Sequence, residues 1–348
     1  MRHLIDITDL SVEEIEGLMD TAADIVAHPE NYRDRCRYKK LATLFFEPST
    51  RTRLSFEAAM MELGGQVLGI PEASSSSAAK GESMADTAKI VSGYADIIAM
   101  RHPLEGAALA AAGKADVPVI NAGDGGHCHP TQTLTDLFAI RRELGRLTHL
   151  TVGLCGDLKY GRTVHSLIAA MSRYPGVTFV SVSPEELRLP DYVTAAMEKA
   201  GIPHRETADL EGALPELDVL YMTRIQRERF ADPAVYERLK DSYVLDTDKM
   251  KKAKETMCVL HPLPRVNEIH PAVDADPRAA YFRQAVGGKY MRMALILKLL
   301  AEREAPASLP QGEPAPHRCR NPRCITRVEQ ALPLLQKDGR CIYCETII

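Results

Sequence analysis

Short apolar runs rich in β-branched residues alternate with amphipathic helical stretches through most of the chain, and this alternation most restricts its fold. Nine candidate strands lie at residues 40–47, 66–70, 96–101, 117–121, 150–155, 177–182, 217–223, 243–246 and 258–261. Helical patterns lie at residues 11–26, 50–63, 82–94, 131–144, 162–173, 192–200 and 289–301. Such alternation predicts an α/β fold in which helices cover both faces of parallel sheets.

The number of candidate strands indicates more than one domain, because a single sheet rarely contains so many. We expect a first α/β domain from residues 1–132 together with 286–304, and a second from residues 133–285. A proline-rich stretch at residues 305–317 is typical of a linker. Residues 318–348 would then form a small third domain.

The composition excludes several functional classes. With 45% hydrophobic and 26% charged residues the chain is typical of soluble globular proteins, and a net charge of -4 gives no general attraction to nucleic acid or anionic membranes. No apolar run approaches the ~18 residues of a membrane span, and the first residues lack the apolar core of a signal peptide. We therefore expect a cytoplasmic protein without membrane or nucleic-acid partners.

The segment Ser-Thr-Arg-Thr-Arg at residues 49–53 follows the first expected strand and begins a helical pattern. Backbone N–H groups at a helix N-terminus, the hydroxyls of Ser49, Thr50 and Thr52, and the guanidinium of Arg51 would together suit a phosphate. The alternative is ordinary capping of the helix by a serine or threonine, with solvated arginines.

Six segments, in order, resemble those of the aspartate and ornithine carbamoyltransferase family, whose fold pairs two Rossmann-like α/β domains. They are residues 49–53, Met-Arg-His-Pro at 100–103, His-Pro-Thr-Gln at 129–132, residues 156–167, Tyr-Met-Thr-Arg-Ile-Gln at 221–226 and His-Pro-Leu-Pro-Arg at 261–265. The last three resemble the aspartate branch. The resemblance covers about residues 1–305. It implies transfer of the carbamoyl group of carbamoyl phosphate to L-aspartate, in de novo pyrimidine biosynthesis.

The resemblance assigns the phosphate half of the site. Carbamoyl phosphate is a mixed anhydride with a dianionic leaving group, so its phosphate must be neutralised. Arg51 with Ser49, Thr50 and Thr52 would do this, and Arg101 would bridge the phosphate and the anhydride oxygen.

Other matched residues would contact the carbamoyl group. His129 and Thr52 would donate to its carbonyl oxygen as negative charge develops there. Gln132 and the backbone carbonyls of Leu263 and Pro264 would accept hydrogen bonds from its NH₂ group. A lone histidine is more often structural, and only the His-Pro-Thr-Gln frame makes His129 an exception.

Arginine suits the planar carboxylates of aspartate, and Arg162 and Arg224 each follow an expected strand. Gln226 would assist them. The alternative is that both arginines form surface ion pairs. The nearest rival function is a transcarbamoylase with another amine acceptor, but a cationic acceptor such as ornithine would be repelled by these arginines.

Residues 72–82 are polar and small, which predicts a loop. The plain interpretation is a flexible linker. By the family resemblance, Ser76 and Lys80 of this loop reach into the active site of a neighbouring subunit, which implies a homotrimer with shared sites. Four consecutive serines leave the choice between Ser76 and Ser77 open.

The implied mechanism is direct attack of the aspartate amine on the carbamoyl carbon, with neither a covalent enzyme intermediate nor an organic cofactor. The leaving phosphate can take the amine proton, and domain closure would exclude water. The expected catalytic residues are Arg51, Thr52, Lys80, Arg101 and His129.

Four cysteines near the C-terminus have the spacing Cys319-x4-Cys324-x16-Cys341-x2-Cys344. In a cytoplasmic chain two close pairs predict a structural Zn²⁺ site, and two disulfides or free thiols are the alternatives. The segment resembles the zinc domain of the regulatory chain of some aspartate carbamoyltransferases, without that chain's nucleotide-binding domain. It would allow a higher assembly of trimers.

Two functions from other classes are alternatives. A nucleic-acid-binding protein is suggested only by six Lys or Arg against three Asp or Glu in residues 317–348, with a single aromatic residue. A catalytically silent scaffold is disfavoured because every expected substrate-contacting position holds a competent residue.

Overall fold

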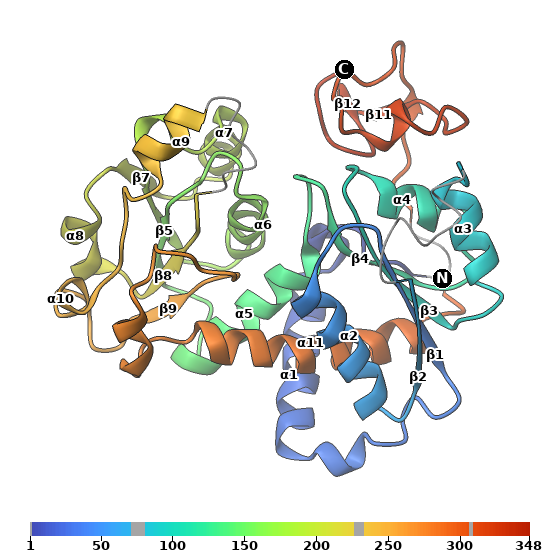
Figure 1. Cartoon of the computed structure of the whole chain (residues 1–348), viewed down its shortest axis with the longest axis horizontal. Coiled ribbons are helices and arrows are strands. Elements are labelled where there is room, and N and C mark those ends of the chain that lie inside the picture. The colour runs from blue at the N-terminus through green and yellow to red at the C-terminus, as the bar shows by residue number, and fades with distance from the viewer. Residues whose placement is uncertain (1, 71–80, 226–232, 306–308) are drawn as a thin grey trace. The chain divides into compact units, whose positions relative to one another are not determined.

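The chain forms two compact units in the computed structural model, which describes residues 2–70, 81–225, 233–305 and 309–348. Unit 1 comprises Met1–Thr131 and Gly288–Ile348, and unit 2 comprises Gln132–Gly287. Both boundaries fall inside helices, namely α5 (Pro130–Leu144) and α11 (Tyr281–Ala301) (Figure 1). Among the described residues no helix is both long and apolar enough to cross a membrane.

Unit 1 contains a parallel four-stranded sheet with the order β2-β1-β3-β4. Its central strands are almost entirely buried, as expected where helices lie on both faces. The strand order reverses between β1 and β3. The elements are α1 (Val12–Ala27), β1 (Lys40–Phe45), α2 (Thr50–Glu62), β2 (Gln66–Ile70), α3 (Met84–Val91), β3 (Ile97–His102), α4 (Ala107–Ala112) and β4 (Val119–Asp124).

Unit 2 contains a parallel five-stranded sheet with the order β7-β6-β5-β8-β9, which reverses between β5 and β8. Its strands are β5 (Thr151–Cys155), β6 (Thr178–Val182), β7 (His204–Thr207), β8 (Val219–Met222) and β9 (Cys258–Leu260). The helices are α6 (Arg162–Met171), α7 (Asp191–Lys199), α8 (Leu210–Ala213), α9 (Pro233–Leu239) and α10 (Thr247–Met250).

The predicted α/β fold with parallel sheets is confirmed. The strand predicted at residues 243–246 is wrong, because only Leu245 forms an isolated bridge, to Ile269, and Asp246 caps α10. Strand β7 was not predicted, since its sequence His-Arg-Glu-Thr lacks an apolar pattern. The six-residue, alanine-rich helix α4 was also missed.

The C-terminal cysteine segment is part of unit 1 and shares a hydrophobic cluster there with α3 and α4. Glu105 donates its backbone N–H to Arg323 O at 2.9 Å and accepts from Ile325 N–H at 2.9 Å. Gly106 has φ +84°, and a Cβ there would lie 2.4 Å from the Cβ of Tyr343, so glycine permits this close approach.

The segment's own sheet is antiparallel, with the order β10-β11-β12. Its strands are β10 (Glu313–Pro314), β11 (Leu335–Lys337) and β12 (Arg340–Cys341). Strand β10 lies within the stretch expected to be a linker, so part of that stretch is built into the small domain.

Candidate active site

The carboxyl ends of β1 and β3 flank the point where the strand order of unit 1 reverses. Ligands of open α/β sheets bind at such reversals, outside the carboxyl ends of the strands. Strand β1 leads into α2 through residues 46–49, and β3 carries Arg101 near its end. The sheet topology therefore brings the predicted phosphate segment and Arg101 together at the carboxyl ends of the strands, which is called the carboxyl edge of the sheet.

Helix α2 begins with its N-terminal backbone donors outside the helical hydrogen-bond ladder. Ser49 is the N-cap but makes no side-chain capping hydrogen bond. The Arg53 N–H donates to Ser49 O at 3.2 Å, whereas the N–H groups of Thr50, Arg51 and Thr52 lie in the turn that has no intrahelical acceptor. Ordinary side-chain capping does not account for these residues, and an anion would satisfy the donors.

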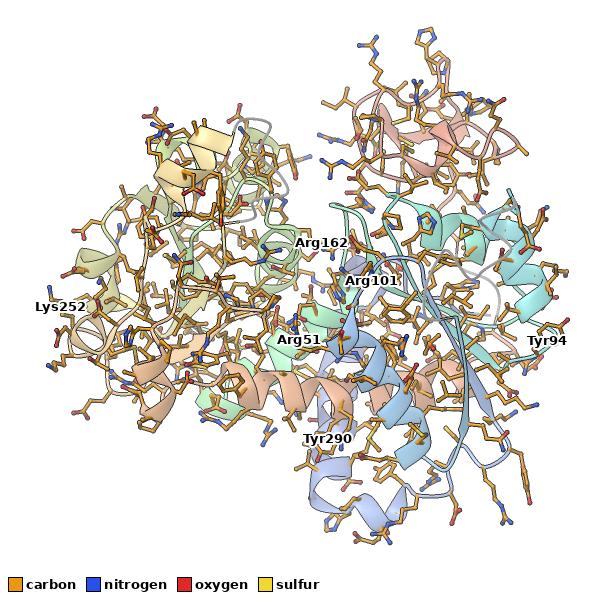
Figure 2. All side chains as sticks on the ribbon, viewed as in Figure 1. Arg51, Tyr94, Arg101, Arg162, Lys252 and Tyr290 are labelled. Atoms are coloured by element: carbon orange, nitrogen blue, oxygen red, sulfur yellow. The ribbon has the colours of Figure 1, made fainter. Side chains whose placement is uncertain are left out.

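Two guanidinium groups meet at this edge, that of Arg51 from α2 and that of Arg101 from β3 (Figure 2). The Arg101 side chain is 13% exposed and pairs with Glu47 at 2.8 Å. Burial lowers the pKa of Arg101 against the effect of Glu47, and burial together with the charge of Arg101 lowers the pKa of Arg51. The Arg101 Nε is buried and has no hydrogen-bond partner among the described residues. A dianion would relieve the repulsion and satisfy this donor.

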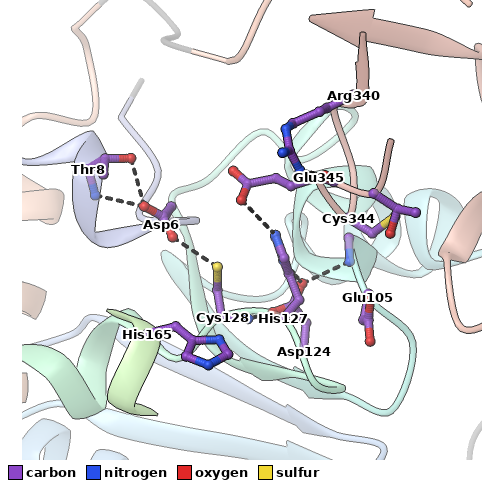
Figure 3. Close-up of polar contacts among 12 residues, drawn as sticks. Asp6, Thr8, Glu105, Asp124, His127, Cys128, His165, Arg340, Cys344 and Glu345 are labelled. Carbon is purple, nitrogen blue, oxygen red and sulfur yellow. Dashed lines mark hydrogen bonds and ion pairs between the residues drawn. The ribbon is translucent and has the colours of Figure 1, made fainter. Parts of the chain in front are cut away.

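The loop before α5, which carries His129, is held by a buried carboxylate (Figure 3). Asp124 accepts hydrogen bonds from the Gly106 N–H at 2.8 Å, the Asn121 Nδ2 at 3.0 Å and the Cys128 N–H at 2.9 Å. His127 Nδ1 lies 3.0 Å from it. Burial opposes the charge of Asp124, but His127 and these donors outweigh it and lower the pKa of the carboxyl group.

Further contacts restrict the same loop. The Cys128 thiol donates to Asp6 Oδ2 at 2.9 Å, and the Thr131 hydroxyl lies 3.4 Å from Nδ1 of His129, which is buried. The side-chain ligand atoms of Asp124, His127 and Cys128 lie within 4.8 Å of one another, as in a metal site. Because hydrogen bonds already engage both the carboxylate and the thiol, we interpret this cluster as an anchor for the loop.

In unit 2 the reversal of strand order lies between β5 and β8, and the two predicted carboxylate-binding arginines follow these strands. Arg162 is the first residue of α6, and Arg224 lies two residues after β8. Both are partly buried. The structure thus brings the segments that carry them to one edge of the sheet, where ligands of such folds bind.

The two segments are held together by Thr223. Its N–H donates to Cys155 O at 2.8 Å, and its hydroxyl accepts from the Asp157 N–H at 3.0 Å. Gly156, between them, has φ +116°, and a Cβ there would lie 2.3 Å from Thr223 O. Only glycine fits this position without displacing the end of β8.

Three further predicted contacts lie in unit 2. Gln132 is in the first turn of α5 and is partly buried, and Leu263 and Pro264 follow β9 and are joined by a cis peptide bond. Ser76, Lys80 and Gln226 lie outside the described residues.

The four C-terminal cysteines are buried, and their sulfur atoms lie within 4.8 Å of one another. The Cys319 and Cys344 sulfurs are 3.4 Å apart, and those of Cys324 and Cys341 are 3.8 Å apart. A disulfide needs ~2.05 Å. A tetrahedral zinc ion with Zn–S bonds of ~2.3 Å places its sulfurs about 3.8 Å apart. The set therefore fits a tetrahedral metal ion and does not fit two disulfides.

Comparison with known families accounts for the two units. The model described as "Aspartate/ornithine carbamoyltransferase, carbamoyl-P binding domain" matches residues 2–142. The model described as "Aspartate/ornithine carbamoyltransferase, Asp/Orn binding domain" matches residues 148–299. This chain belongs to the aspartate/ornithine carbamoyltransferase family. The cysteine segment lies outside both matches.

Several relatives within this family are aspartate carbamoyltransferases. The chain is 60% identical over 301 residues to the aspartate carbamoyltransferase catalytic subunit of Lachnoclostridium phytofermentans, covering 86% of this chain and 98% of that protein. The catalytic subunit of M. jannaschii aspartate transcarbamoylase has a TM-score of 0.82 at 47% identity, covering 88% of this chain and all of that one. The Trypanosoma cruzi enzyme in complex with carbamoyl phosphate and aspartate has a TM-score of 0.81 at 37% identity, over 86% of this chain and 96% of that one.

Several residues that shape these edges in this carbamoyltransferase were missed by the sequence analysis. They are Asp124 and His127, which anchor the His129 loop, Thr223, which joins two strand ends, and Asp136, which binds Gln132. Asp136 could have been found from the sequence, because it follows Gln132 by four residues on a predicted helix, a spacing that places two side chains in contact. Asp124 and Thr223 act through contacts with distant segments, and His127 acts through Asp124.

Proposed function

We propose that this chain catalyses the aspartate carbamoyltransferase reaction, in which carbamoyl phosphate and L-aspartate give N-carbamoyl-L-aspartate and phosphate. Each substrate binds at the carboxyl ends of the strands of one of the two sheets. The edge of unit 1 binds carbamoyl phosphate and that of unit 2 binds the carboxylates of aspartate. One observation supports this assignment most directly. Each sheet has two arginine-bearing segments where its strand order reverses, with Arg51 and Arg101 in unit 1 and Arg162 and Arg224 in unit 2. Identity of 60% to aspartate carbamoyltransferase catalytic subunits supports the reaction.

Binding of the phosphate rests on charge and on oriented donors. Arg51 and the N-terminal N–H groups of α2, with the hydroxyls of Ser49, Thr50 and Thr52, surround the phosphoryl oxygens. Arg101 adds its unsatisfied Nε donor and neutralises charge on the bridging oxygen as the C–O bond breaks. Donors held in place before the reaction stabilise developing charge without reorganising.

The carbamoyl carbon is attacked by the neutral amine of aspartate, which gives a tetrahedral intermediate. His129 and Thr52 donate to its oxyanion. Collapse of the intermediate breaks the bond to the bridging oxygen, and the departing phosphate takes a proton from the nitrogen. No protein base is required, and positioning with electrostatic stabilisation supplies the acceleration.

The acceptor preference follows from the charge at the second edge. Arg162 and Arg224, with Gln226, bind the two carboxylates of aspartate, whereas ornithine would bring a cationic side chain to the same arginines. In steady-state assays with carbamoyl phosphate we expect kcat/KM for ornithine to be at least about 100-fold below that for aspartate. Succinate, which has both carboxylates but no amine, should compete with aspartate. Comparable turnover of both amines would contradict the assignment.

The active site is completed by a second copy of the chain. The family resemblance indicates a homotrimer in which Ser76 and Lys80 of one subunit contact carbamoyl phosphate bound by its neighbour. This proposal concerns residues outside the described part of the chain and rests on the sequence match.

Mixed trimers test the shared site. Lys80→Ala and Arg51→Ala chains should each be nearly inactive as pure trimers. After mixing under conditions that exchange subunits, some interfaces pair an intact Lys80 with an intact Arg51, so activity should return to roughly a quarter of the wild-type value or less. Each variant remixed with itself is the control. Hybrid trimers that form, as shown by mass spectrometry, but stay inactive would exclude sharing.

The C-terminal cysteine segment, residues 318–348, is called the cysteine module below. It holds one structural zinc ion, and with four thiolate ligands the ion has no position left for substrate. Zinc supplies the folding energy of a segment too small to form its own core. The Cys-rich sequence is similar to the zinc domain of the regulatory chain in this family. Its contacts with Glu105 and α4 support a role in covering this face of unit 1 within the same chain.

A further inference from the structure

A buried chain of hydrogen bonds in unit 2 begins at Gln132 and runs through the fully buried Asp136. The Oδ1 atom of Asp136 accepts from Gln132 Nε2 at 2.7 Å and from Gln284 Nε2 at 2.6 Å. Its Oδ2 atom accepts from the Tyr221 hydroxyl at 2.9 Å. Both oxygens of the carboxylate are thus occupied by donors from different elements.

The direction of these bonds is fixed by a backbone group. The N–H of His261 donates to Gln284 Oε1 at 3.0 Å. A backbone N–H can only donate, so the oxygen of the Gln284 amide must face it and the nitrogen must face Asp136. The Oδ1 atom of Asp136 is therefore an acceptor.

This direction determines how Gln132 is oriented. Its amide meets the same Oδ1 atom, so it must present its nitrogen there and turn its oxygen away. No hydrogen bond to that oxygen is found within the described ranges. Gln132 and Asp136 are four residues apart on α5, a spacing that keeps them in contact on one helix face. Gln132 thus offers an acceptor and not a donor.

The other end of the chain of bonds reaches the segment after β9. His261 Nδ1 accepts from the Leu263 N–H at 2.7 Å, so its Nε2 carries the hydrogen that is donated to Glu268 at 2.7 Å. Both His261 and Glu268 are buried. Leu263 has φ +54°, a conformation that a branched side chain rarely adopts and that surrounding contacts must hold.

We propose that Asp136 is a positioning residue that makes the carbamoyl pocket accept hydrogen bonds only, and so selects a donor with an NH₂ group over one with a methyl group. The proposal rests on the proposed function, in which Gln132 and the carbonyls of Leu263 and Pro264 face the carbamoyl nitrogen. Asp136 fixes the first directly and is linked to the others through Gln284 and His261.

A methyl group in place of NH₂ leaves these acceptors unpaired once the bound molecule excludes water from them. Each unpaired buried acceptor weakens binding about 10- to 100-fold. If the Gln132 amide were free to turn, its nitrogen could face the pocket and this penalty would shrink. Discrimination between the two donors therefore depends on the acceptor at position 136.

Two stable analogues test this, because a methylene in place of the anhydride oxygen prevents turnover. Phosphonoacetamide keeps the NH₂ group, and acetonylphosphonate has a methyl group in its place. Isothermal titration gives Kd for each, and the ratio of the two is the readout. Asp136→Ala should lower the preference for phosphonoacetamide by about 10-fold or more.

Two matched variants separate this role from general stability. Asp136→Asn can keep an oxygen toward both glutamines and turn its nitrogen to the Tyr221 oxygen, so it should retain the wild-type ratio within about threefold. Tyr221→Phe removes the other bond to Asp136 and should leave the ratio unchanged, although its melting temperature will fall. Loss of discrimination in the Asn variant as large as in Ala would overturn the role of acceptor polarity.

The remaining outcomes are also decisive. Gln132→Ala must lose the preference if the pocket itself is correctly assigned. A folded Asp136→Ala protein with the wild-type ratio, beside a Gln132→Ala protein that has lost it, would reject the role of Asp136 alone. An unchanged ratio in Gln132→Ala would reject the pocket together with the proposal. Should Asp136→Ala fail to fold, Asp136→Ser replaces it, because a hydroxyl donates as well as accepts and cannot dictate the amide orientation.

Discussion

Replacing Arg224 with alanine is expected to lower kcat/KM for aspartate roughly 30- to 700-fold, which corresponds to the loss of about 2–4 kcal/mol from a charged hydrogen-bonding partner. The position of Arg224 after β8, at the reversal of strand order in unit 2, is the structural reason. Because Arg51 and Arg101 lie in unit 1, binding of carbamoyl phosphate should stay within about threefold of wild type. Steady-state kinetics with each substrate varied, and titration with phosphonoacetamide, measure both effects.

The matched control is Arg188→Ala, since Arg188 is also in unit 2 but is half exposed and pairs only loosely with Glu206, at 3.8 Å. Such a surface pair contributes little, so aspartate kinetics should not change. An Arg224→Ala protein with wild-type aspartate kinetics would remove Arg224 from the substrate site.

The second large effect is expected from loss of the metal. Cys324→Ala should reduce zinc from about one ion per chain to near zero and unfold the cysteine module. The cluster that the module shares with α3 and α4 would then be exposed. Loss of about 2–3 kcal/mol of packing should lower the melting temperature of unit 1 by roughly 5–10 °C. Metal analysis and calorimetry measure these changes without reference to activity.

Turnover should survive this change. The relatives that align over 98% of their own length have no counterpart of the module, and the thiolates leave the ion no site for substrate. Deletion of residues 306–348 should therefore also leave an active enzyme, with any assembly through the module lost. Cys36→Ala is the control, because its buried thiol lies outside the cluster and zinc should be retained. A folded deletion variant that binds both substrates yet has no turnover would show that the module shapes the active site.

Much of the fold could be predicted from local sequence, because buried parallel strands are continuous apolar runs and the helices between them are amphipathic. The capping box formed by Ser11 and Glu14 at the start of α1 is one such local signal. Strand β7 could not be found this way, since it lies at the sheet edge where polar residues are tolerated. The apolar run at residues 243–245 was misleading because burial of Leu245 does not require a strand.

The candidate site was predictable only as separate segments. The matched motifs indicated which residues bear the chemistry, but spacing alone says nothing about which strand ends are neighbours. Sheet order supplies that information, and it explains why Arg162 and Arg224, far apart in sequence, follow adjacent strands. Supporting contacts such as Asp124 with Gly106, or Gln284 with His261, join residues whose identities form no motif.

The division of unit 1 between the two ends of the chain has a consequence for synthesis. Translation proceeds from the N-terminus, so all of unit 2 emerges from the ribosome before residues 288–348, which complete unit 1, have emerged. Domains generally fold as units during synthesis. At that stage unit 1 lacks the second half of α11, which belongs to it, whereas every residue of unit 2 is available to form its core. A nascent chain stalled soon after unit 2 has emerged would contain one folded unit, and it would be the second one.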